Sequence, residues 1–310
     1  MNKKRILLTG GNGMVGRNLL EHPDTQAFEM IVPTRQELDL TKFGAVLDFV
    51  TVHRPDCVLH AAGKVGGIQA NIREPVSFLL DNIDIGRNVI WAARQAGVKH
   101  LINLGSSCMY PRNINTPLKE AQVLSGELEP TNEGYAIAKI VAARLCSYIS
   151  SEDTDFQYKT LIPCNLYGRH DKFDPANSHL IPAIIHKIYQ AKTHAKKSVE
   201  IWGDGTARRE FMYAGDLADA LVRSINEFES LPATMNVGLG SDHSIDEYYH
   251  AAAEIIGFSG SFTHNLEKPV GMARKLVSIE KQKVWGWQSS HTLHEGIEKT
   301  YAFYLKGISK

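Results

Sequence analysis

The chain has 310 residues, of which 43% are apolar and 22% are charged, and its formal net charge is zero. This composition is typical of a globular protein with a buried core, and it argues against a nucleic-acid-binding surface. No apolar run reaches the length of a membrane span, and the four cysteines lack metal-site spacing. We therefore expect a cytoplasmic protein with no metal site, no membrane association and no nucleic-acid partner.

In chain order, short apolar runs alternate with amphipathic stretches. Strands are expected at 5–9, 30–32, 56–62, 101–104 and 158–163, and helices at 17–21, 43–53, 76–96 and 135–149. This alternation predicts an α/β fold of the Rossmann type, a doubly wound parallel sheet with helices on both faces. Residues 1–168 are expected to form this nucleotide-binding domain, to which residues of about 210–240 return.

Beyond residue 168 the alternation loosens. Residues 168–178 are polar and rich in turn formers. Further elements are expected as helices at 180–190, 216–228, 245–256 and 293–304 and as a strand at 199–202. We interpret residues 169–310 mainly as a smaller, mixed α/β region that binds substrate.

Three glycines, Gly10, Gly13 and Gly16, lie between the first expected strand and the first expected helix. This is the context of a dinucleotide-binding turn, in which glycines allow a tight bend and the helix N-terminus faces the pyrophosphate. Met14 and Val15 of the same turn are expected to contact the cofactor. A glycine-rich turn without a ligand is the alternative.

Arg35 follows the second strand, where NAD-binding proteins usually place a carboxylate. A guanidinium complements a 2′-phosphate, so the hypothesis is NADP(H), with Asp39 and Leu40 near the adenine. A solvated surface arginine is the alternative.

Tyr135 and Lys139 are four residues apart on an expected helix, and Ser106 follows the strand at 101–104. A phenol beside an ammonium is a proton donor whose pKa is expected to be lowered, and a serine hydroxyl can bind the same substrate oxygen. An ordinary helix surface is the alternative. The pattern resembles the extended branch of the short-chain dehydrogenase/reductase superfamily, which reduces carbonyl groups with a nicotinamide cofactor.

Cys108 lies two residues after Ser106, where dehydratases of this branch carry an acidic pair. The resemblance implies a base for a 3,5-epimerase rather than a dehydratase, since thiolates abstract protons well beside a cation. His179, where a loop meets a helix, is the candidate acid on the opposite face. The alternatives are a small buried side chain for Cys108 and a structural role for His179.

Several longer runs resemble the GDP-L-fucose synthase family, whose members are GDP-4-keto-6-deoxy-D-mannose 3,5-epimerase-4-reductases. The matching runs are residues 64–68, 105–111, 129–139, 165–168, 177–179, 202–206 and 209–211. The resemblance implies that cofactor contacts are completed by Ala62, Gly105, Ser106, Tyr135, Lys139, Pro163, Asn165, Leu166 and His179. It implies substrate contacts from Ser107, Cys108, Asn165, Lys187, Trp202, Arg209 and Lys275.

The resemblance implies NADPH-dependent formation of GDP-L-fucose by a homodimer that pairs the 76–96 and 135–149 helices. Three departures bear on the substrate. Val270 replaces a usual acidic residue, Lys187 stands where some members have arginine, and residues 213–216 replace a usual His-x-Asp-Asp run. The same chemistry on a colitose-type or 6-deoxyheptose-type GDP-keto-sugar stays open, as do a reductase-only or epimerase-only enzyme and a non-catalytic NADP-binding protein.

Overall fold

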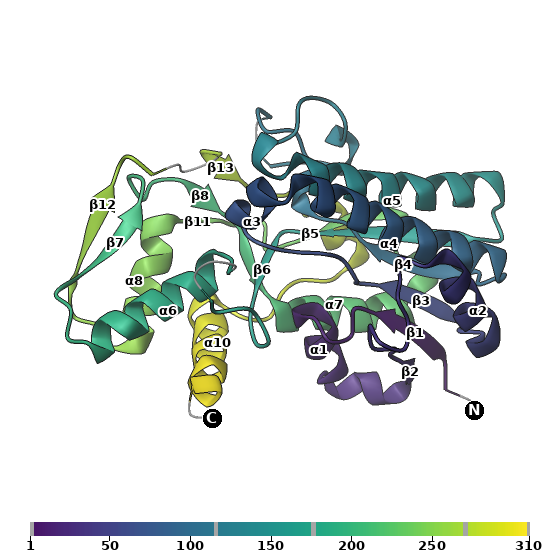
Figure 1. The fold of residues 1–310 in the computed structure, drawn as a ribbon, viewed down its shortest axis with the longest axis horizontal. Coiled ribbons are helices and arrows are strands. Elements are labelled where there is room, and N and C mark those ends of the chain that lie inside the picture. Colours follow the sequence, from purple (N-terminus) through teal and green to yellow (C-terminus); the bar gives the residue numbers. More distant parts are fainter. Residues whose placement is uncertain (1–2, 115–116, 175–177, 269–271, 309–310) are drawn as a thin grey trace.

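The computed structural model describes residues 3–114, 117–174, 178–268 and 272–308. Its larger lobe holds a six-stranded sheet in the order β2-β1-β3-β4-β5-β10, and all five pairings are parallel (Figure 1). The strands are β1 (Arg5–Thr9), β2 (Glu29–Ile31), β3 (Cys57–His60), β4 (His100–Leu104), β5 (Gln157–Pro163) and β10 (Thr234–Val237). The strand order reverses between β1 and β3, which opens a crevice at the carboxyl ends of the strands.

Helices cover both faces of this sheet. One face carries α2 (Phe43–His53), α4 (Pro75–Gln95) and α5 (Glu133–Glu152), and the other carries α1 (Met14–Leu20) and α7 (Ala214–Asn226) (Figure 1). The expected Rossmann-type doubly wound sheet is therefore confirmed. The α1 helix begins three residues before its expected start, because the chain turns into the helix directly after Gly13.

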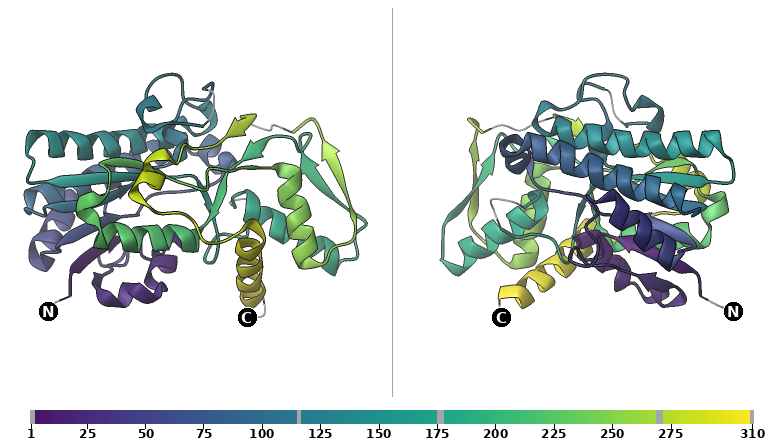
Figure 2. Two further views of the ribbon diagram at one scale, coloured as in Figure 1. Left: turned by 180° about the vertical axis from the view of Figure 1, so that it is seen from behind. Right: turned by 45° about the vertical axis from the view of Figure 1, so that its right-hand side comes forward.

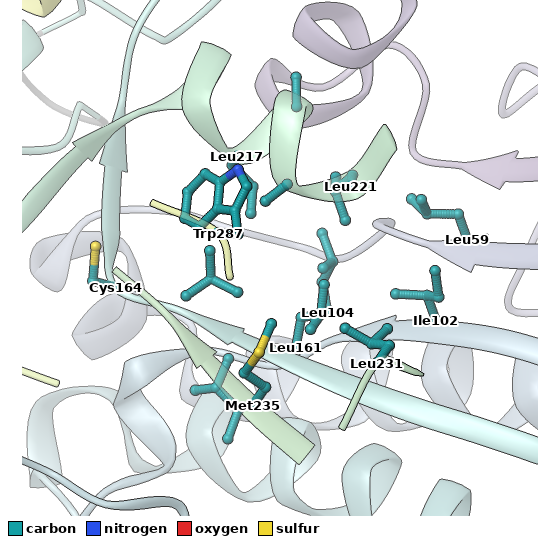
Figure 3. Packing of buried hydrophobic residues seen from close by; sticks show 14 of the residues in the cluster. Leu59, Ile102, Leu104, Leu161, Cys164, Leu217, Leu221, Leu231, Met235 and Trp287 are labelled. Carbon is teal, nitrogen blue, oxygen red and sulfur yellow. The ribbon is translucent and has the colours of Figure 1, made fainter. Parts of the chain in front are cut away.

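Strand side chains alternate between two cores, as the pleat requires. Leu7, Val58 and Leu101 face the core beneath α4, whereas Leu59 and Ile102 face the core beneath α7. Figure 3 shows the second core, where Leu217 and Leu221 of α7 approach the strand residues and Trp287 closes one end. Because both faces are buried, the strands are continuous apolar runs.

The smaller lobe has a core of its own. It contains α6 (Leu180–Thr193), α8 (Ile245–Ile256) and α10 (Leu293–Ile308), with β7 (Ser198–Trp202) parallel to β12 (Ser261–Asn265). A three-stranded sheet joins β11 (His243–Ser244), β8 (Arg208–Arg209) and β13 (Arg274–Lys275). Isoleucines of α6 pack on tyrosines of α8 in this lobe.

Two short parallel strands, β6 (Asn165–Tyr167) and β9 (Phe211–Tyr213), connect the lobes (Figure 2). Residues 210–240 return from them to the large lobe, since α7 packs on α1 and β10 pairs with β5. Short helices, α3 (Ile68–Arg73) and α9 (Glu280–Trp285), complete the fold. In the part of the chain that the structure describes, none of the helices combines the length and apolarity that crossing a membrane needs.

Candidate active site

The glycine turn, residues 10–16, leads from β1 into α1 and requires glycine at its tightest positions. Gly10 has φ +78°, and a Cβ there would lie 2.7 Å from the Ala62 nitrogen. A Cβ on Gly16 would lie 2.4 Å from the Gly10 oxygen. Gly13 is the N-cap of α1, which has no side-chain cap and no acidic residue in its first turn. The free N–H groups therefore suit a pyrophosphate, and Met14 and Val15 are half-buried beside them.

The end of β2 leads into a turn with one exposed cation, Arg35. The carboxylate of Glu37 accepts a hydrogen bond from the Thr34 nitrogen at 2.8 Å and is directed at its own turn. Asp39 accepts from the Thr41 hydroxyl at 2.8 Å and from its nitrogen at 3.0 Å, and these bonds lower the pKa of Asp39. Arg35 is thus the exposed group at this turn that fits a 2′-phosphate, because its two acidic neighbours are occupied.

The remaining predicted cofactor residues lie at the carboxyl ends of the central strands. Ala62 follows β3, and Gly105 follows β4 and donates to the Leu161 oxygen at 2.8 Å. Pro163 ends β5, and Asn165 of β6 donates from Nδ2 to the Glu210 oxygen at 3.0 Å. Leu166 of β6 is half-buried, and so is Leu40, which lies after β2. Asn88 of α4 donates a hydrogen bond to the Leu40 oxygen at 2.9 Å. Their contacts with a cofactor stay predictions.

The structure brings Ser106, Tyr135 and Lys139 together. Lys139 Nζ donates to the Leu104 oxygen at 2.9 Å and lies 5.8 Å from the centre of the Tyr135 ring. Burial lowers the pKa of Lys139 to about 8. Burial, and next the charge of Cys108, raises the pKa of Tyr135 above its usual value, while the hydrogen bond to Ser106 works in the opposite direction.

The expectation of a lowered pKa for Tyr135 was therefore wrong for this structure. Its physical reason is burial, which disfavours a phenolate and which sequence spacing does not reveal. The tyrosine is held fully protonated at neutral pH, so it retains the proton that it would donate.

Cys108 is half-buried in a short 3₁₀ turn, Ser107–Met109, that Ser106 caps by accepting from the Cys108 nitrogen at 3.3 Å. Its sulfur accepts a hydrogen bond from Asn132 Nδ2 at 3.2 Å and lies 3.8 Å from Lys275 Nζ. Ser107 is buried in the same turn. The other cysteines, Cys57, Cys146 and Cys164, are buried and free.

His179 is the N-cap residue of α6 and is half-buried. Burial, and next the charge of Lys172, lowers its pKa. A Cβ on Gly67 would lie 3.0 Å from the Ser178 oxygen, and a Cβ on Gly63 would lie 3.7 Å from Lys139 Nζ. Residues 63–67 therefore extend from Lys139 to the loop that carries His179. Asn177 and Val270 lie outside the described residues.

Of the substrate residues predicted in the smaller lobe, Lys187 and Trp202 lie side by side, and Lys268 adds a second cation beside the indole. Lys187 Nζ lies 5.2 Å and Lys268 Nζ 5.5 Å from the Trp202 ring centre, and Trp202 is 43% exposed. Burial lowers the pKa of Lys187, and likewise that of Arg209. An exposed aromatic ring between cations suits a base and a diphosphate.

Two buried carboxylates, which were not predicted from the sequence, hold the three-stranded sheet of β8, β11 and β13 in place. Glu210 accepts hydrogen bonds from the nitrogens of Leu239, Gly240 and Val277 at 2.6, 2.9 and 2.8 Å, and burial raises its pKa to about 7. Asp242 bridges Arg208 at 2.8 Å and Arg274 at 2.5 Å across the three-stranded sheet. The doubled arginine at 208–209 was the available signal for Asp242, because a buried acid needs a donor such as Arg208.

Asn132 and His60 were also missed. Asn132 lies in the 129–139 run that resembles the family, but no role was predicted for it. His60 is fully buried, shares a 2.7 Å hydrogen bond with Thr9, and has its pKa lowered to about 3 by burial and then by Lys139. Its ring is neutral and supports the floor of the site. Among the described residues, no cluster of three or more acidic, histidine or cysteine side chains is arranged to hold a metal ion.

The doubly wound sheet and its smaller mixed lobe define the fold of short-chain dehydrogenases and epimerases. The chain belongs to the NAD dependent epimerase/dehydratase family, whose model matches residues 6–238. It is 52% identical to GDP-L-colitose synthase of Yersinia pseudotuberculosis over 97% of this chain and 98% of that protein. It is 49% identical to GDP-L-fucose synthase of Azorhizobium caulinodans over 98% of this chain and 97% of that protein.

A solved structure extends this comparison. A GDP-mannoheptose C4 reductase from Campylobacter jejuni, with NADP bound, aligns with a TM-score of 0.88 and 31% identity, over 98% of this chain and 99% of that one.

Proposed function

We propose that this protein epimerises a GDP-4-keto-6-deoxy sugar at C3 and C5 and then reduces its C4 carbonyl with NADPH. GDP-4-keto-6-deoxy-D-mannose is the first candidate substrate, which makes GDP-L-fucose the product. The observation that supports this most is that the short turn carrying Cys108 packs on α5, the helix in which Lys139 Nζ lies 5.8 Å from the Tyr135 ring centre. One pocket thus combines a thiol base with a carbonyl-reducing trio.

In the epimerisation, the Cys108 thiolate removes the proton from the carbon beside the keto group. The C–H bond breaks, an S–H bond forms, and the electron pair moves onto the C4 oxygen as an enolate. The hydroxyls of Ser106 and Tyr135, which hydrogen-bond to each other, stabilise that oxygen. His179 returns a proton from the opposite face.

In the reduction, bound NADPH supplies the hydride for C4. Tyr135 gives its proton to the C4 oxygen. The tyrosine is protonated beforehand because burial raises its pKa. Lys139, with a pKa of about 8, is mostly charged at neutral pH and stabilises the phenolate left behind. The glycine turn and Arg35 hold the cofactor diphosphate and 2′-phosphate.

A GDP-4-keto-deoxy sugar of the colitose type is the second candidate substrate. The 52% identity to GDP-L-colitose synthase over nearly the whole chain favours it. Steady-state kcat/KM values on a panel of GDP-keto-sugars separate the two, because the true substrate is turned over with the highest ratio. A reductase-only enzyme is disfavoured by Cys108 and its two partners, and a non-catalytic role by the intact Ser106, Tyr135 and Lys139.

The proposed function is tested by incubating the enzyme with GDP-4-keto-6-deoxy-D-mannose in deuterated water, first without and then with NADPH. We expect deuterium at C3 and C5 before NADPH is added, and NADPH oxidation afterwards. NADPH oxidation without deuterium in the product would contradict the epimerase half. Failure of both reactions with every GDP-keto-sugar tested would favour the non-catalytic alternative.

We also propose a homodimer built on α4 and α5, which pack side by side (Figure 1). Apolar side chains on both helices remain exposed, including Val76 at 67%, Leu80 at 53%, Val141 at 39% and Tyr148 at 60%. A second copy would bury this stripe in a four-helix arrangement. Val141→Glu should yield a monomer by analytical ultracentrifugation, whereas Val52→Glu on α2 should not. A monomeric wild-type protein at micromolar concentration would contradict it.

A further inference from the structure

Two side chains from distant parts of the chain converge on the Cys108 sulfur. Asn132 Nδ2 donates to it at 3.2 Å from just before α5, and Lys275 Nζ lies 3.8 Å away on β13 of the smaller lobe. We propose that Asn132 and Lys275 stabilise the thiolate of Cys108, so that the base is complete only when β13 lies against the large lobe. This inference rests on the proposed epimerase function and assigns the base its positioning residues.

The orientation of Asn132 supports this role. Asparagine at an N-cap normally accepts a hydrogen bond from the first turn of its helix. Asn132 is the N-cap of α5 but makes no such bond with its side chain. Its amide nitrogen is directed at the sulfur instead, and its Oδ1 is buried without a hydrogen-bond partner among the described residues. The side chain therefore serves the thiol rather than the helix.

Lys275 supplies a cation that faces the sulfur directly. The charged and titratable groups around Cys108 are Tyr135 and Lys139 from α5 and Lys275 from β13. Tyr135 is neutral in this setting, and the ammonium of Lys139 is directed at the Leu104 oxygen. A cation and an amide donor beside a cysteine sulfur stabilise its negative charge.

The position of Lys275 is held by the charged sheet, which comprises β8, β11 and β13. Lys275 pairs with Arg209 across β13 and β8. Arg274 is bound to Asp242 at 2.5 Å on one side, and the Val277 nitrogen donates to Glu210 at 2.8 Å on the other. The strand is thus fixed at the residue before Lys275 and two residues after it. A flexible surface lysine would lack this support.

The sequence assigns Lys275 to the substrate, and the two roles predict different behaviour when substrate is absent. Iodoacetamide alkylation of the substrate-free protein, followed by intact mass between pH 5 and pH 10, measures the thiolate fraction. Cys108 is half-buried whereas the other three cysteines are buried, so one modification is expected. Cys108→Ala identifies the site by abolishing it.

We expect Lys275→Gln to slow alkylation about tenfold at pH 7, because loss of the nearby cation lowers the fraction of thiolate, the reactive form. At pH 10 the rate should equal that of the wild type, and Lys275→Arg should restore most of the rate at pH 7. Asn132→Leu should slow the reaction about threefold. Lys283→Gln on α9 removes the same charge from an exposed position and should change nothing.

Three results would overturn the inference. Lys275→Gln would do so if its profile superimposed on that of the wild type while KM for the GDP-sugar rose, because Lys275 would then act on substrate alone. If alkylation of the Lys275→Gln variant were slowed equally at every pH, Lys275 would control the access of iodoacetamide to Cys108 rather than the charge of the sulfur. Unchanged alkylation in Asn132→Leu would show that Asn132 does not stabilise the thiolate. If instead the alkylation shifts appear but wild-type enzyme exchanges no deuterium into substrate, the thiolate pairing stands and the proposed function fails.

Discussion

The glycine turn forms one end of the proposed site, in the large lobe, and the charged sheet forms the other, in the smaller lobe; the two are built differently. The glycine turn is contiguous backbone, in which Gly10 and Gly16 are required because any side chain would clash within 3 Å. The charged sheet is made of side chains from separate segments, held by Glu210 and Asp242. The first is specified locally, whereas the second exists only after the smaller lobe has folded.

This difference suggests how cofactor and substrate can be changed independently. Backbone N–H groups bind any pyrophosphate, so relatives with different reactions can share the turn. If side-chain donors in the charged sheet bind the sugar nucleotide, as proposed, their placement depends on the buried contacts of Glu210 and Asp242. Substitutions in one end should therefore leave binding at the other end intact.

The largest expected effect is at Tyr135, where the two ends meet. Tyr135→Phe removes the proton donor for C4, and we expect hydride transfer to fall by about 10²–10⁴-fold. Deuterium exchange into the sugar should continue, because the proposed base, Cys108, is unchanged. Single-turnover NADPH oxidation and exchange in deuterated water measure the two steps separately. Normal NADPH oxidation by this variant would exclude Tyr135 as the donor.

Arg35 is the charged exception at the backbone-built end. Arg35→Ala should weaken NADPH binding about tenfold to thirtyfold and leave NADH binding unchanged, since only NADPH carries the 2′-phosphate. Fluorescence titration with each cofactor measures both affinities. Lys196→Ala, an exposed charge removed from the smaller lobe, is the matched control. Equal affinity of the wild type for NADH and NADPH would contradict the role of Arg35.

The pH dependence of reduction tests Lys139. Its lowered pKa of about 8 means that the ammonium is present below pH 8 and is lost as pH rises through that value. Hydride transfer should therefore fall about tenfold between pH 7 and pH 9, because the fraction of charged lysine falls by that factor. A rate independent of pH over this range would show that the charge of Lys139 does not assist Tyr135.

The smallest expected effect lies in the charged sheet. Glu210→Gln replaces one acceptor by an N–H₂ group, which cannot accept from the Val277 nitrogen. Movement of β13 should raise KM for the GDP-sugar about fivefold and leave NADPH affinity unchanged. Glu254→Gln, an exposed acid on α8, is the control. Loss of NADPH affinity in Glu210→Gln would mean that the two ends are coupled.

The parts of the site that could be predicted from sequence are those encoded by neighbouring residues. The glycine turn is one motif, and the spacing of Tyr135 and Lys139 reflects one helix turn. Cys108 and His179 were found only through resemblance to a family. The contacts of Cys108 with Asn132 and Lys275 join residues 24 and 167 positions apart, and no local pattern marks them.

Burial explains the remaining differences. The raised pKa of Tyr135 and the pKa of about 7 at Glu210 both come chiefly from loss of water. An acidic residue such as Glu210 reads as a surface group in sequence, because most acids are exposed. Its environment is created by Leu239, Gly240 and Val277, which arrive from two other segments. The fold class was predictable because its strands and helices alternate plainly.

Cys108 and Tyr135 are proposed to catalyse two different reactions at one site. The most direct test is NMR analysis of GDP-4-keto-6-deoxy-D-mannose recovered from Cys108→Ser in deuterated water without NADPH. We predict no deuterium at C3 or C5, in contrast to the wild type, while the variant still oxidises NADPH with the unepimerised keto sugar. Deuterium exchange by Cys108→Ser at the wild-type rate would contradict the claim.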